Sequence, residues 1–158
     1  TLSWRCHWPS ESHIPSAPFN PILSHTWYIK LVITVNIIIT DSKIRNAKKF
    51  DDAFSGLKDV ITVPDRPGNE KHVYHLYIIF AKKRDQLYKY CLKKGIEAKI
   101  HYPTPIYRQE PFLKIGYKKG MFPITDSHVK KIISFPCDQH LKNQELQYIV
   151  STVKKFYK

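Results

Sequence analysis

Glycine is scarce in this chain, since 158 residues contain five glycines and no two of them are adjacent. Glycine-rich turns are the usual way to bring several backbone N–H groups to a phosphate. The sequence therefore offers no phosphate-binding loop of that kind. Cysteine is rare as well, with Cys6, Cys91 and Cys137 far apart and odd in number. Neither a disulfide framework nor a paired-cysteine zinc site is indicated, and free thiols suit a reducing cytoplasm.

Long apolar runs are also missing. The longest, from Trp27 to Ile39, is interrupted by Lys30 and Asn36. It falls short of the roughly 20 apolar residues that a membrane-spanning helix requires. The N-terminal residues do not show the basic and then apolar order of a signal peptide. We therefore expect a soluble, cytoplasmic protein without membrane contact.

Acidic residues are in the minority, because 13 aspartates and glutamates stand against 26 lysines and arginines, which gives a formal charge of +13. Such a charge fits nucleic acid, an anionic membrane surface, or a lysine-rich solvated exterior. The lysines come as scattered pairs, and no recognisable nucleic-acid-binding motif accompanies them. We favour the solvated exterior and do not expect nucleic acid as a partner. A stand-alone basic module that binds nucleic acid or another polyanion remains the alternative function.

The patterning divides the chain into residues 1–40 and residues 41–158, a total length that suits one ordinary globular domain. The first segment contains four prolines and three tryptophans, has almost no charge and shows no periodicity before Thr26. Its last part, IKLVITVNIIIT at 29–40, is dense in β-branched residues. Such a composition predicts extended structure.

From Asp41 onward the sequence predicts alternating helices and strands. Apolar residues recur every three or four positions, which predicts helices over 42–57, 125–135 and 144–157 and another over 84–94. The first of these has Asp41 or Ser42 as its capping residue. Strands are predicted where β-branched and aromatic residues dominate, over 60–63, 72–82 and 96–102. This alternation indicates an α/β or α+β domain, a small sheet with helices packed on one face.

Three motifs follow one another in this segment: HVYHLYIIF, KKGIEAKIHYPTPIYRQ and GYKKGMFPITDSHVKKIISFPCDQHL. Their order, with a closing amphipathic helix, resembles the C-terminal small domain of the DegT/DnrJ/StrS sugar aminotransferases. The helix with Arg45, Asn46 and Ala47 is similar to the family's helix that enters this domain, so the resemblance covers about residues 40–158. It implies a mostly antiparallel sheet, as in fold type I aminotransferases. There a large domain holds pyridoxal phosphate on a lysine, and the small domain closes the active site.

The resemblance implies amino transfer from an amino acid, with glutamate as the expected donor, to a nucleotide-linked keto sugar. Enzymes of this kind work as homodimers and serve polysaccharide or antibiotic sugar assembly. Pyridoxal phosphate is the electron sink, and the protein must supply a Schiff-base lysine, a carboxylate for the pyridinium nitrogen and a phosphate cradle. The family's lysine lies in a Ser-x-x-Lys stretch followed by paired glycines, and this chain has no paired glycines. We therefore expect a fragment without the lysine-bearing domain, which binds no cofactor alone and is inactive alone.

The first 39 residues or so align with nothing in the family. They fit a lineage-specific extension, an out-of-frame reading upstream of an authentic fragment, or the remnant of a decayed gene. The lack of patterning favours the second or third. A non-catalytic interaction or regulatory protein descended from the enzyme is a further possibility.

The resemblance also indicates site residues in the His-Tyr-Pro loop. It assigns His101 a polar contact to the substrate and Tyr102 a stacking or hydroxyl contact, with Pro103 holding the loop. The alternative for His101 is a hydrogen-bonded histidine at the end of a strand. No catalytic residue is expected within the chain.

Tyr107 and Gln109 follow in the same loop and are predicted to line the same cleft, with packing as the alternative. Arg108 is a candidate phosphate partner because its guanidinium fork matches phosphate oxygens. A surface ion pair is the alternative for this arginine. His72 and His75 would lie on opposite faces of a strand, so they do not predict a shared metal.

Overall fold

The computed structural model describes residues 21–158, with the side chains of residues 30–158. The chain divides into residues 1–35 and residues 36–158, and each unit is described by itself. The predictions for Cys6 and for the proline-rich stretch up to residue 20 lie outside the described residues. None of the helices within residues 21–158 has the length and hydropathy that crossing a bilayer requires.

The first helix, α1, runs from Pro21 to Phe54. The prediction of extended structure at 29–40 is therefore wrong, and so is the prediction that a helix begins at Asp41 or Ser42. β-Branched residues lose only tenths of a kcal/mol each in a helix, and extending a helix is easier than nucleating one. The strand propensity of residues 29–40 is thus overridden, because the helix formed by the following segment extends into them. A short 3₁₀ turn, η1 (Ser55–Leu57), ends the element.

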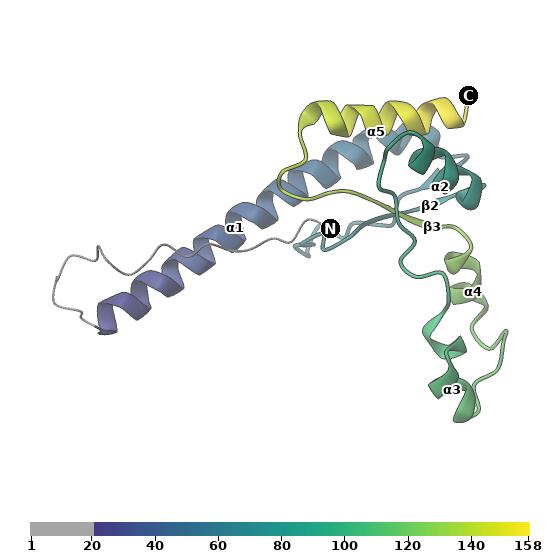
Figure 1. Ribbon diagram of the computed structural model, residues 1–158, viewed down its shortest axis with the longest axis horizontal. Coiled ribbons are helices and arrows are strands. Elements are labelled where there is room, and N and C mark those ends of the chain that lie inside the picture. Colours follow the sequence, from purple (N-terminus) through teal and green to yellow (C-terminus); the bar gives the residue numbers. More distant parts are fainter. Residues whose placement is uncertain (1–20) are drawn as a thin grey trace, which may run out of the picture. The chain divides into compact units, whose positions relative to one another are not determined.

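Three antiparallel strands form the sheet, in the order β1 (Ile61–Thr62), β2 (Tyr77–Ala81) and β3 (Ile132–Phe135). In the register of β2 and β3, Tyr77 pairs with Phe135 and Ile79 with Ile133. The small antiparallel sheet predicted for the domain is thereby confirmed. Figure 1 shows β2 and β3 crossing the centre of residues 36–158.

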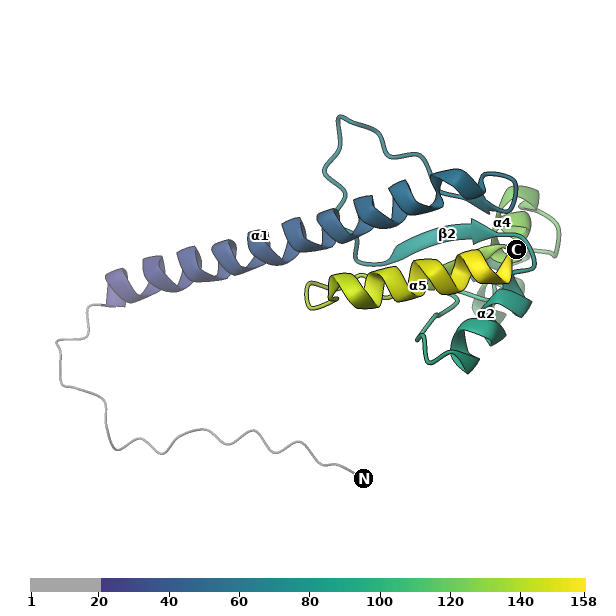
Figure 2. The same cartoon turned by 90° about the horizontal axis from the view of Figure 1, so that it is seen from above.

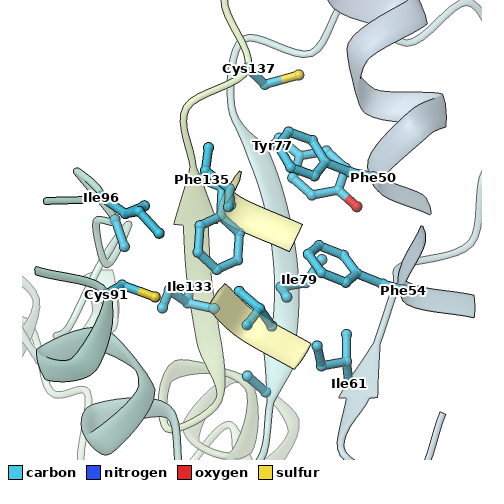
Figure 3. Packing of buried hydrophobic residues seen from close by; sticks show 14 of the residues in the cluster. Phe50, Phe54, Ile61, Tyr77, Ile79, Cys91, Ile96, Ile133, Phe135 and Cys137 are labelled. Carbon is cyan, nitrogen blue, oxygen red and sulfur yellow. The ribbon is translucent and has the colours of Figure 1, made fainter. Parts of the chain in front are cut away.

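Three helices cover one face of the sheet: the part of α1 from residue 36 on, α2 (Arg84–Lys93) and α5 (Asn143–Phe156) (Figures 1 and 2). Phe50 and Phe54 of α1 point toward the strands in Figure 3. Because strand residues alternate between faces, Tyr77, Ile79 and Ala81 meet this layer and are all buried. The helices add a shared group of buried apolar residues: Leu87, Cys91, Leu146, Ile149 and Val153.

Three elements differ from the predictions, the first of them because short apolar runs do not separate strand from helix by period. The helix predicted over 125–135 is α4 (Pro123–Val129), and Ile132 and Ile133 belong to β3 instead. The strand predicted over 96–102 is reduced to one bridge between Lys99 and Ser134. The strand predicted over 72–82 is confined to β2.

A segment between this bridge and β3 extends from the sheet and is called the arm, residues 104–129 (Figure 1). It contains η2 (Ile106–Arg108), α3 (Glu110–Lys114) and α4. Gly116 and Gly120 both have positive φ, at 101° and 88°. Only glycine takes such angles without strain, so these two positions allow the chain to reverse between α3 and α4.

Candidate functional site

His101 is attached to the sheet through Ser134 of β3. The backbones of Ser134 and Lys99 exchange two hydrogen bonds, at 3.0 and 2.8 Å. Two residues beyond Lys99, the Nδ1 atom of His101 lies 2.9 Å from the Ser134 hydroxyl oxygen. Ser134 also pairs with Ile78 of β2 and is 3% exposed. A buried strand therefore fixes the position of the imidazole.

A pocket of about 200 Å³ opens beside this histidine. Its polar lining includes Lys43, His75, Lys99, His101, Ser134 and Asp138. The Lys99 ammonium is 2.8 Å from the Glu97 carboxylate, another lining residue. The hydrogen bond from this ammonium lowers the pKa of Glu97 and, reciprocally, raises the pKa of Lys99. The pocket thus presents charges of both signs around two imidazoles, those of His75 and His101, and the hydroxyl of Ser134.

Tyr102 lies on the surface next to His101 and is 69% exposed. Its ring meets the His101 ring edge-on, with centroids 5.5 Å apart and planes at 85°. An exposed aromatic ring held against a fixed neighbour can stack on a flat ligand or contact a sugar through its hydroxyl. The structure therefore brings together two of the predicted site residues, His101 and Tyr102.

Tyr107 is buried in the arm, and its hydroxyl is already engaged. It donates to Asp126 Oδ2 at 2.7 Å and accepts from the Gly120 N–H at 3.3 Å. Burial and the bond to Asp126 raise the pKa of Tyr107. Arg108 approaches the same carboxylate, with its Nη1 atom 3.7 Å from Oδ1. These contacts match the packing and ion-pair alternatives, and a substrate role for Tyr107 or Arg108 stays a prediction. Gln109 is exposed at the start of α3.

The two histidines that precede β2 do not lie on a strand, which corrects the expected geometry. His72 accepts a hydrogen bond from the Tyr74 N–H through Nδ1 at 3.0 Å, whereas His75 lines the pocket beside His101. Within the part of the chain that the structure describes, no three metal-ligating side chains gather.

The cofactor that the family uses makes a further demand on these residues. A Schiff-base lysine must reach the cofactor in a site closed to water, where its amine is desolvated. Among residues 30–158 every lysine is exposed except Lys43, which is half-buried. The described residues therefore do not fit pyridoxal phosphate by themselves.

Ser134 was missed at the level of the sequence. It stands alone among apolar residues in IISFP, and that segment was predicted to be helical. A single hydroxyl within a buried strand is a signal only after the strand itself is recognised.

The three-stranded sheet, its helical layer and the arm together have the fold of sugar aminotransferase domains. An aminotransferase of this kind from Brucella abortus superimposes with a TM-score of 0.66 at 25% identity, over 75% of this chain and 31% of that one. DesV of S. venezuelae, solved with a ketimine intermediate, gives a TM-score of 0.71 at 21% identity, over 75% and 32%. The similarity to DesV shows a shared fold and nothing more.

A model of the DegT/DnrJ/EryC1/StrS aminotransferase family matches residues 38–154, and the chain belongs to this family. It is 34% identical over 100 residues to a pleiotropic regulatory protein of Geobacillus stearothermophilus, covering 63% of this chain and 27% of that protein. A dTDP-3-amino-3,6-dideoxy-alpha-D-galactopyranose transaminase of Aneurinibacillus thermoaerophilus is 25% identical over 96 residues, covering 61% and 26%. The chain thus spans under a third of the length of these relatives.

Proposed function

We propose that residues 41–158 are the C-terminal small domain of a nucleotide-sugar aminotransferase and contribute substrate contacts to its active site. The observation that carries the proposal is the anchored His101 beside a pocket, in a chain that belongs to this family. An imidazole fixed on a strand and an exposed tyrosine ring suit the oxygens and rings of a nucleotide sugar.

The substrate class is proposed from the relatives. One of them is named for a dTDP-linked amino sugar and another for a UDP-N-acetyl-dehydroglucosamine. The keto sugar would accept the amino group of an amino acid, with glutamate as the proposed donor, and the enzyme would work as a homodimer in the cytoplasm. His101 and Tyr102 would bind and orient the sugar nucleotide.

The chemistry of amino transfer would be supplied by pyridoxal phosphate held outside these 158 residues. Because the described lysines are exposed except for the half-buried Lys43, we expect no specific aldimine on this chain. Incubation with pyridoxal phosphate, reduction with borohydride and peptide mapping should show scattered, substoichiometric labelling. Stoichiometric labelling of a single lysine would contradict this part of the proposal.

Substrate contact is tested on the full chain by NMR titration with dTDP-glucose and UDP-N-acetylglucosamine. The side-chain signals of His101 and Tyr102 should shift in a saturable way. His101→Gln and Tyr102→Ala should weaken binding, whereas His140→Gln should not, because His140 is exposed and does not line the pocket beside His101. Equal affinity in the His101 and Tyr102 variants, or no shift with either ligand, would overturn the proposal.

A further inference from the structure

The side chain of Ser134 has a single hydrogen-bond partner within the described residues. Its backbone N–H and C=O are both used by Lys99. Its hydroxyl meets only Nδ1 of His101, at 2.9 Å. Ser134 is 3% exposed, so its hydroxyl has little access to bulk water.

This geometry determines which group donates. A hydroxyl carries one proton, and a buried donor without an acceptor is destabilising. If Nδ1 of His101 carried the imidazole proton and donated it to Ser134, the serine proton would have no acceptor among residues 21–158. If Ser134 donates instead, both groups are satisfied. Nδ1 is then the acceptor, and the neutral ring carries its proton on Nε2.

We infer that Ser134 is a positioning residue, which holds His101 in the Nε2–H tautomer so that it donates a hydrogen bond to a ligand oxygen. Within the described residues, Nε2 of His101 has no protein partner in hydrogen-bond range. The ring lines the pocket, so this N–H is a donor available to a ligand there, beside those of the lining lysines. The second part of the inference, the hydrogen bond to a ligand, is called the ligand half and rests on the proposed function. The ligand atom would be an oxygen acceptor on a sugar or on a diphosphate.

The tautomer is measured on the full chain labelled with ¹⁵N-histidine, by long-range ¹H–¹⁵N correlation at a pH where imidazole is neutral. We expect a single Nε2–H form for His101. Ser134→Ala should allow a measurable Nδ1–H population, and Ser134→Thr, which keeps the hydroxyl, should restore the single form. A dominant Nδ1–H form in the unmodified chain, or an unchanged spectrum in Ser134→Ala, would overturn the inference. His140, which is exposed and does not line the pocket beside His101, is the internal reference signal.

The ligand half is tested with dTDP-glucose and with inorganic pyrophosphate. Ser134→Ala should weaken binding about 3- to 10-fold, as expected for one misdirected hydrogen bond, with recovery in Ser134→Thr. Loss with both ligands assigns the acceptor to the diphosphate, and loss with the sugar nucleotide alone assigns it to the sugar. If the chain binds neither ligand but the tautomer responds to Ser134→Ala, the proposed function fails while the positioning role stands. If Ser134→Ala leaves the affinity for the sugar nucleotide unchanged, the ligand half is overturned.

Discussion

Phe50 of α1 stacks on Tyr77 of β2, with ring centroids 4.9 Å apart and planes inclined by 28°. The Tyr77 hydroxyl continues this contact into a polar cluster, because it donates to Asp51 Oδ1 at 2.7 Å. Arg66 pairs with the other carboxylate oxygen at 3.3 Å and lies over the Tyr77 ring, 5.8 Å from its centroid. Burial, followed by the bond to Asp51, raises the pKa of Tyr77. The helix is thus joined to the sheet by both apolar and charged contacts.

Tyr77→Phe should keep the ring stacking and remove one donor from Asp51. A hydrogen bond to a charged group contributes about 1.5–3 kcal/mol, so we expect a loss of that order in the free energy of unfolding, measured by urea denaturation. Tyr148→Phe is the matched control, because its half-exposed hydroxyl bonds to the Lys94 carbonyl at 2.9 Å and water can replace that contact. We expect a loss of about 0.5 kcal/mol for the control. Equal losses in the two variants would contradict the role of the polar cluster.

Helix α2 provides a second matched pair. Leu87 is 0% exposed and Leu92 is 45% exposed on the same helix. Leu87→Ala should lower the free energy of unfolding by about 2–5 kcal/mol, since it removes buried methyl groups and leaves a cavity. Leu92→Ala should change it by less than about 1 kcal/mol. Thermal and urea unfolding of both variants measure the difference, and a Leu92 effect as large as that of Leu87 would show that α2 packs differently.

The sequence predicted the sheet and its helical layer where patterns were long or strongly biased. Leu87 and Cys91 belong to a clear amphipathic helix, and the aromatic run around Tyr77 was identified as a strand. The sequence did not predict the helical structure of residues 29–40. β-Branched residues have only a weak preference for strands, and a neighbouring helix overrides it. It also failed at Ile132 and Ile133, where spacing after α4 imitates a helix although the residues pair with β2.

The candidate site was only partly accessible from the sequence. His101 and Tyr102 were predicted from a family resemblance, and the structure places them side by side. Ser134 could not be predicted, because its proximity to His101 depends on a bridge between segments 35 residues apart in numbering, Lys99 and Ser134. The partners of Tyr107 could not be predicted either, because Asp126 lies 19 residues further along the chain and contacts Tyr107 only in the folded arm.

Two buried thiols make the stability sensitive to alkaline pH. Burial raises the pKa of Cys91 to about 11, and burial together with the nearby Asp138 carboxylate raises that of Cys137 to about 12. In the unfolded chain a cysteine thiol has a pKa of about 8.5. Below that pH both states hold the proton, and above it the unfolded state releases protons first, so stability declines as pH rises toward the folded values. The urea concentration at the unfolding midpoint should therefore decrease as the pH is raised from about 8.5 to about 11. The decrease should be less steep in a Cys91→Ala, Cys137→Ala double variant.

The same burial predicts slow thiol chemistry. Because the thiolate is the reactive form, Cys91 and Cys137 should react with a disulfide reagent far more slowly in the native chain at pH 8 than in guanidinium. A Cys6→Ser background restricts the signal to these two thiols. Rapid native labelling of either residue would contradict its burial.

Tyr107 and Tyr102 lead to opposite expectations for the same substitution. Tyr107→Phe removes the hydroxyl that joins Asp126 to the Gly120 N–H, so the arm should lose about 1.5–3 kcal/mol of local stability. Hydrogen exchange should accelerate in residues 104–129 and not in β2 or α5. Tyr102→Phe removes an exposed hydroxyl and should leave exchange unchanged, while a ligand contact through that hydroxyl would appear as weaker dTDP-glucose binding. If Tyr107→Phe instead weakens dTDP-glucose binding with exchange in the arm unchanged, Tyr107 contacts substrate and the packing role is wrong.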